Sequence, residues 1–148
     1  PDTRLTLGGT AFELRHRGGG HTPGDMAVWL PQAQVAFAGD IVYVDRLLSV
    51  LPVSSTKAWL DAFAALEPLA PKHIVPGHGR VTDMATARAQ TRDYLRALRA
   101  HMKRAVEQGI DVSDAVKSFH AVPFLHLSNA AELNPGNANR TYLEVERE

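Results

Sequence analysis

Three residues of the types that bind metals or act in catalysis stand beside glycines. They are His21 in GGGHTPGD, Asp40 in AGD and His78 in PGHG. Glycine has no Cβ, so the backbone beside it can bend sharply and come close to a bound group. Two imidazoles and one carboxylate form a donor set that suits zinc, and also iron or manganese. Thiolate ligands are excluded, because the chain has no cysteine.

The three residues are too far apart in the sequence for a site of the zinc-finger type. Each follows or ends an extended run, and side chains at the ends of neighbouring strands can converge across a folded scaffold. Taken singly, each motif is also typical of a plain turn, as Pro23-Gly24 illustrates. Asp25 has two open roles, which are to hold a ligating histidine through its second ring nitrogen or to cap its own turn.

The pattern of apolar residues predicts a chain of the α/β class, with short strands first and helices later. The expected strands form a pair within 3–16 joined at Gly8-Gly9, and further runs at 26–31, 34–40 and 73–75. The first four are expected to be antiparallel and hairpin-like. A helix capped by Ser54, Ser55 or Thr56 is expected to run through KAWLDAFAALEPL and to bury one apolar stripe.

Helices dominate the expected structure after residue 81. A long helix should begin at Thr82 or Asp83 and end at Gly109, and a short helix over 113–119 should be capped by Ser113. Residues 123–139 are expected to form a loop or a broken helix, and 139–148 a terminal helix. We therefore predict one domain over 1–148, with a strand-rich part (1–81) that carries the metal residues and a helical part (82–148).

Charge and hydropathy narrow the classes of partner. The 16 basic and 16 acidic side chains cancel, which argues against a nucleic-acid or anionic-membrane surface. No apolar run reaches the roughly 18 residues that a membrane span needs. We expect no nucleic acid and no membrane as partners, and the sequence does not distinguish a cytoplasmic from a periplasmic location.

The motifs GGGHTPGD, AGD and IVPGHG, in this order and with the WLDAFAALEPL helix between the last two, resemble the C-terminal half of the metallo-β-lactamase fold. The resemblance covers about residues 10–82 well. It implies half of an αββα sandwich, which carries two metal ions at one edge of its sheets. By this resemblance His21 would bind the first ion, Asp40 would bridge both ions at the catalytic centre, and His78 would bind the second.

Asp40 bears on the subclass that the resemblance implies. Many antibiotic-degrading zinc lactamases have a cysteine at the matching position, whereas an aspartate resembles the broader branch that includes hydroxyacylglutathione hydrolases and other thioesterases. The implied activity is hydrolysis of a small ester, thioester or lactam by zinc-activated water. The sequence does not identify the substrate within that range.

The HxHxDH motif of the family's first half does not occur in these 148 residues. We therefore expect a C-terminal portion of a metallohydrolase, with partial or no metal occupancy and negligible turnover by itself. One apolar sheet face should lack its partner, which predicts self-association or pairing with the missing N-terminal half. The alternative is a non-catalytic, self-associating structural or binding module in which GGGH and PGHG are plain turns.

Overall fold

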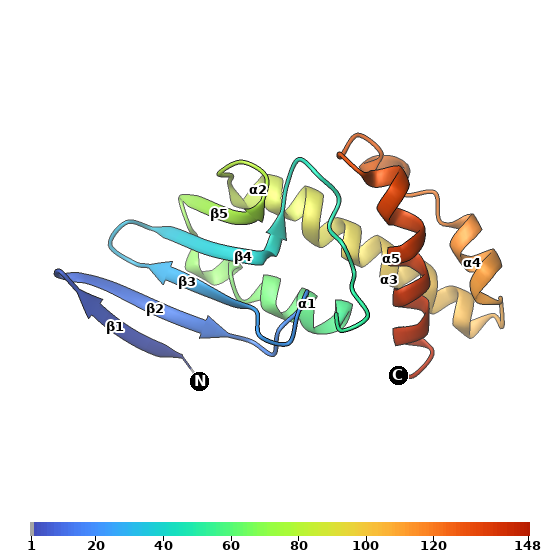
Figure 1. Cartoon of the computed structure of the whole chain (residues 1–148), viewed down its shortest axis with the longest axis horizontal. Coiled ribbons are helices and arrows are strands. Elements are labelled where there is room, and N and C mark those ends of the chain that lie inside the picture. Colours follow the sequence, from blue (N-terminus) through green and yellow to red (C-terminus); the bar gives the residue numbers. More distant parts are fainter. Residues whose placement is uncertain (1) are drawn as a thin grey trace.

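A five-stranded sheet lies at one end of the molecule and the helices α4 and α5 lie at the other (Figure 1). The computed structural model describes residues 2–148, so Pro1 of the predicted domain lies outside the described residues. The strands are β1 (Thr3–Leu7), β2 (Thr10–His16), β3 (Met26–Leu30), β4 (Val35–Tyr43) and β5 (His73–His78). They follow this order across the sheet, antiparallel from β1 to β4 and parallel between β4 and β5. The predicted α/β class with mainly antiparallel strands is confirmed.

The crossover between the parallel strands β4 and β5 runs through α1 (Thr56–Ala64). Ser55 caps α1, because its hydroxyl accepts a hydrogen bond from the backbone N–H of Ala58. The helix ends before Pro68, which falls in a separate 3₁₀ turn, η1 (Glu67–Leu69). The predicted helix over KAWLDAFAALEPL is therefore too long at its C-terminal end.

The core lies between the sheet, α1 and the later helices. Trp59, Phe63 and Leu66 are buried, as their helical spacing predicts. The irregular segment between β4 and α1 is also largely buried, because Leu47, Leu48 and Val50 are each at most 1% exposed. A loop this deep needs hydrogen-bond partners for its backbone, and they come largely from side chains of the helical part.

The long helix predicted over 82–109 exists, but a π-helical turn interrupts it. It comprises α2 (Met84–Ala87), the π turn η2 (Arg88–Arg92) and α3 (Asp93–Glu107), and Asp83 caps it through the N–H of Thr86. In the π turn, the Thr91 hydroxyl accepts from the Tyr43 N–H at 3.0 Å and donates to the Tyr43 carbonyl at 2.6 Å. This turn therefore fastens the helix to the end of β4.

Two predictions about the last third of the chain are wrong. The cap of α4 (Val112–Ser118) is Asp111 rather than Ser113. After a 3₁₀ turn, η3 (Val122–Phe124), residues Ala130–Val145 form one continuous helix, α5. The helix predicted at 139–148 therefore exists but begins earlier, at residue 130, where a loop or broken helix was expected. Pro135 and Gly136 lie inside α5, and tertiary contacts of its buried face outweigh their poor helix propensity. Among residues 2–148, no helix combines the length and hydropathy that crossing a bilayer requires.

One face of the sheet is apolar, and no other element of residues 2–148 covers it. The register places Leu14, Val28 and Phe37 side by side across β2, β3 and β4, on the face opposite buried Trp29 and Ala36. Phe37 is 44% exposed, and other large apolar residues on β1 and β3 are similarly exposed. Large exposed apolar faces of this kind favour association with another surface.

Candidate metal centre

The residues expected to bind metal lie on two neighbouring strands and one loop. His78 is the last residue of β5, and His21 lies in the loop between β2 and β3. Asp40 lies inside β4 rather than at the end of a strand, which corrects the predicted strand end at residue 40. The pairing of β4 with β5 shifts register on both sides of Gly39, whose φ is +52°. Such a bulge redirects the neighbouring side chain, and the Asp40 carboxylate here turns toward both histidines.

The structure brings all three side chains together around Asp40. The Nε2 atom of His21 lies 3.5 Å from Oδ2 of Asp40, and Nε2 of His78 lies 3.5 Å from Oδ1. These separations exceed the usual hydrogen-bond range of about 2.7–3.2 Å. They are close to the roughly 3.4 Å expected between two ligand atoms that share a tetrahedral zinc with bonds of about 2.1 Å. The donor set and its spacing therefore suit a metal ion at each imidazole–carboxylate pair.

The pairs do not merge into a single complete site. Within the described range 2–148, no three histidine, aspartate or glutamate side chains surround one point as the ligands of one ion would. Each imidazole instead faces its own carboxylate oxygen. This arrangement could hold two ions that share Asp40, each with only part of the three or four protein ligands that zinc usually has.

A backbone carbonyl fixes the orientation of His21. Its Nδ1 donates a hydrogen bond to the carbonyl oxygen of Ser49 at 2.9 Å, since a carbonyl can only accept. The neutral ring therefore carries its lone pair on Nε2, the atom that faces Asp40. The ring is only 9% exposed and packs edge-on against Trp59, with ring centroids 5.3 Å apart. Ser49 is a partner that sequence analysis missed, because a backbone acceptor leaves no signal in the residue type.

Of the two roles left open for Asp25, the structure displays contacts for one. Its carboxylate accepts from the Thr22 N–H at 2.9 Å and from the Thr22 hydroxyl at 2.5 Å, which closes its own turn. The second ring nitrogen of His21 is instead held by Ser49. Thr22 is therefore occupied within this turn.

Tyr43 lies beside both histidines. Its ring stacks on His78 with centroids 4.5 Å apart and lies 5.8 Å from the ring of His21. Burial raises the pKa of the Tyr43 phenol, and the negative charge of Asp40 raises that pKa further. The phenol therefore stays protonated at neutral pH and forms an uncharged wall of the site.

Two glycines of the motifs allow close approach within the protein itself. A Cβ on Gly77 would overlap Oδ1 of Asp40 and lie 2.7 Å from the backbone carbon of Gly39. A Cβ on Gly20 would lie 3.0 Å from the Cα of Trp59. The motif glycines therefore let β5 pack against Asp40 and let the His21 loop pack against α1.

The family model described as the metallo-beta-lactamase superfamily matches residues 2–78, which include all three converging residues. The chain belongs to this superfamily. A curated superfamily member from Bacteroides fragilis, a metallo-beta-lactamase type 2, is 32% identical over 80 residues. The aligned region covers 51% of this chain and 32% of that relative. The chain thus spans about a third of the length of the curated relative.

Solved structures of other proteins share the fold of this chain. A metallo-beta-lactamase from Pontibacter korlensis has a TM-score of 0.59 and 30% identity, covering 65% of this chain and 46% of that one. The sec-alkylsulfatase Pisa1 from Pseudomonas sp. has a TM-score of 0.77 over 96% of this chain and 25% of that one. At 20% identity, this second likeness shows the fold alone. This likeness covers nearly the whole chain, including the helical part.

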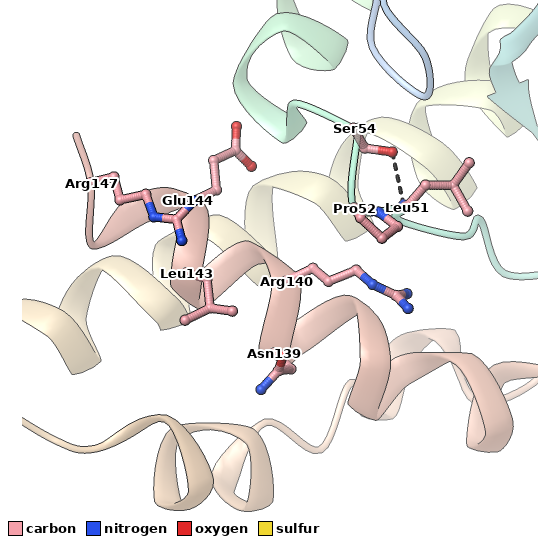
Figure 2. A pocket seen from close by; sticks show the side chains of 8 residues that line it. All are labelled: Leu51, Pro52, Ser54, Asn139, Arg140, Leu143, Glu144 and Arg147. Carbon is pink, nitrogen blue, oxygen red and sulfur yellow. Dashed lines mark hydrogen bonds between the residues drawn. The ribbon is translucent and has the colours of Figure 1, made fainter.

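The chain also has an open groove of about 580 Å³ between α5 and the segment that carries Leu51, Pro52 and Ser54 (Figure 2). Arg140, Glu144 and other residues of α5 and its C-terminal end form the opposite wall. His21, Asp40 and His78 are not among its lining residues. The groove is therefore a different place on the molecule from the three residues that the metallo-beta-lactamase motifs contain.

Proposed function

We propose that His21, Asp40 and His78 are metal ligands in a metal-dependent hydrolase, with Asp40 shared between two ions. The observation that carries this proposal is the Asp40 carboxylate, which faces one imidazole nitrogen on each oxygen at 3.5 Å. The Ser49 contact supports it, because a ligating histidine commonly donates its other ring N–H to a carbonyl or carboxylate. Zinc is the proposed metal, and iron or manganese would also accept these donors.

The proposed chemistry is hydrolysis of a small ester, thioester or lactam. Zinc, when bound, supplies hydroxide at neutral pH because it lowers the pKa of water to about 7. The role of this chain is to present Nε2 of His21 and of His78 and both oxygens of Asp40 in a fixed arrangement. Trp59 and Tyr43 shield His21 from bulk water on its inner side, which strengthens electrostatic interactions there. The metallo-beta-lactamase relatives favour a lactam, and the aspartate at position 40 favours a thioester.

Since the chain spans only part of its relatives, we propose that residues outside these 148 complete the ligand set. By itself the chain would bind metal weakly and turn over substrate negligibly. This follows from the two separate imidazole–carboxylate pairs, each short of the usual number of zinc ligands.

Zinc titration of the chain and of two histidine variants tests the proposal. His78→Ala should lower zinc affinity by at least about 10-fold, because loss of even an indirect support of a ligand costs that much. His126→Ala is the matched control, since His126 is an exposed histidine in the helical part. Equal affinity in wild type and His78→Ala would contradict the metal role and favour the non-catalytic module. Sub-micromolar binding with measurable esterase turnover would contradict the proposed inactivity of the isolated chain.

We further expect the isolated chain to self-associate through the uncovered sheet face. Phe37, at 44% exposure near the middle of that face, should contribute to the contact. Sedimentation velocity at tens of micromolar should detect oligomers, and Phe37→Lys should shift them toward monomer. Val122→Lys is the control, because Val122 is 68% exposed but lies in the helical part. A clean wild-type monomer would contradict this expectation.

A further inference from the structure

The buried amide of Asn137 on α5 holds the backbone on both sides of Ser49. Its Oδ1 accepts from the Val50 N–H at 2.8 Å, and its Nδ2 donates to the Leu48 carbonyl at 2.8 Å. Ser49, the residue between them, is the one whose carbonyl accepts from Nδ1 of His21. One side chain of the helical part thus brackets the peptide unit that orients a proposed metal ligand.

The surrounding hydrogen bonds fix which end of the amide faces which partner. Asn137 is 1% exposed, and its Nδ2 also donates to the Tyr94 hydroxyl at 3.0 Å. That hydroxyl in turn donates to Oδ1 of Asn134 at 2.9 Å. Burial raises the pKa of the Tyr94 phenol, so it keeps the proton that this donation requires. The network leaves Asn137 a single orientation, with its acceptor toward Val50 and its donor toward Leu48.

A second residue of α5 holds the same segment. The Arg140 guanidinium donates to the Val50 carbonyl at 2.6 Å, so Val50 is bonded at both its N–H and its carbonyl. Arg140 is exposed and lines the groove beside the segment (Figure 2), whereas Asn137 is enclosed. Asn137 therefore holds the Leu48–Val50 segment from inside the protein, and Arg140 holds it from the surface.

We infer that Asn137 is a positioning residue for the proposed metal centre. By holding Leu48 and Val50 it directs the Ser49 carbonyl at His21, which keeps the proton on Nδ1 and the lone pair on Nε2 toward Asp40. Loss of the amide frees the peptide units around Ser49 to rotate, and the neutral imidazole then populates its other tautomer. The significance for metal binding rests on the proposed function, whereas the effect on the tautomer does not.

The test compares Asn137→Ala with Asn134→Ala in the metal-free chain. Both remove a buried amide of α5, but Asn134 bonds to Tyr94 and to the Phe119 carbonyl rather than to the Ser49 segment. The ring ¹⁵N shifts of His21 report which of its two nitrogens carries the proton. We expect the Nδ1–H form to dominate in wild type and Asn134→Ala and to fall in Asn137→Ala. Zinc affinity should fall by about 10-fold in Asn137→Ala only.

Asn137→Asp keeps the side-chain volume and the acceptor for Val50 but loses the donor to Leu48. We expect Asn137→Asp also to lower the population of the Nδ1–H tautomer of His21. This variant tests the positioning role if Asn137→Ala does not fold. Wild-type ¹⁵N shifts in the folded Asn137 variants would overturn the inference. A changed tautomer in a chain that binds no zinc in any variant would support the positioning role and refute the proposed function.

Discussion

Replacing Gly77 with alanine should lower zinc affinity by roughly 10- to 100-fold, the range seen when the support of a metal ligand is lost. The added Cβ would overlap Oδ1 of Asp40 and would lie 2.8 Å from the Asp40 backbone nitrogen. Gly77 does not have a positive φ, so the effect comes from this overlap and not from backbone strain. Either the carboxylate rotates away from His78 or β5 moves away from β4. Crowding of this kind also costs about 1–3 kcal/mol in the free energy of unfolding.

Gly24→Ala is the matched control, because Gly24 lies in the GGGHTPGD motif and, among residues 2–148, no heavy atom beyond its own chain neighbours lies within 4 Å of an added Cβ. Isothermal titration with zinc and urea denaturation of both variants separate the effect on the ligand from the effect on the fold. If Gly77→Ala bound zinc as wild type does, the Asp40 carboxylate would not need the position that it has beside β5. The proposed sharing of Asp40 by two ions would then be refuted.

Sequence reasoning could find the ligand candidates because their signals are local. A histidine or aspartate beside glycine can be recognised from the residues themselves, and the strand patterns placed His21, Asp40 and His78 each beside or at the end of an extended run. The extent of β4 was not predictable in this way, since Asp40 lies at a bulge three residues before the strand ends. A bulge depends on how one strand pairs with its neighbour, and the sequence of a single strand does not specify that register.

Other features depend on contacts that are distant in sequence. Pro135 and Gly136 favour a break, yet α5 continues through them because Asn134 and Asn137 are bonded to the core. The partner of His21 is the backbone of Ser49, whose orientation depends on a helix near the other end of the chain. Local propensity predicts neither the unbroken α5 nor the partner of His21, because tertiary hydrogen bonds decide the conformation of both segments.

Replacing Trp59 with alanine should destabilise the chain by about 3–5 kcal/mol, the usual cost of truncating a buried tryptophan. Trp59 is fully buried, and its Nε1–H donates to the Ile41 carbonyl at 3.0 Å, one residue after Asp40. Its backbone also forms the surface against which Gly20 packs, one residue before His21. The total free energy of unfolding of a domain is about 5–15 kcal/mol, so this loss is a large share of it. Urea denaturation followed by far-UV circular dichroism measures it.

Trp59→Phe separates the contribution of the Trp59–Ile41 hydrogen bond to stability from the contribution of ring packing. The phenyl ring fills much of the same space but leaves the Ile41 carbonyl without its donor, which should cost about 1–3 kcal/mol. Trp29→Phe is the control, since Trp29 lies in β3, is 7% exposed and, within residues 2–148, forms no hydrogen bond with the His21 loop or with Ile41. Trp59→Phe should also weaken zinc binding, whereas Trp29→Phe should not. Equal losses of stability and of zinc affinity in the two variants would mean that the indole does not tie the His21 loop to β4 beside Asp40.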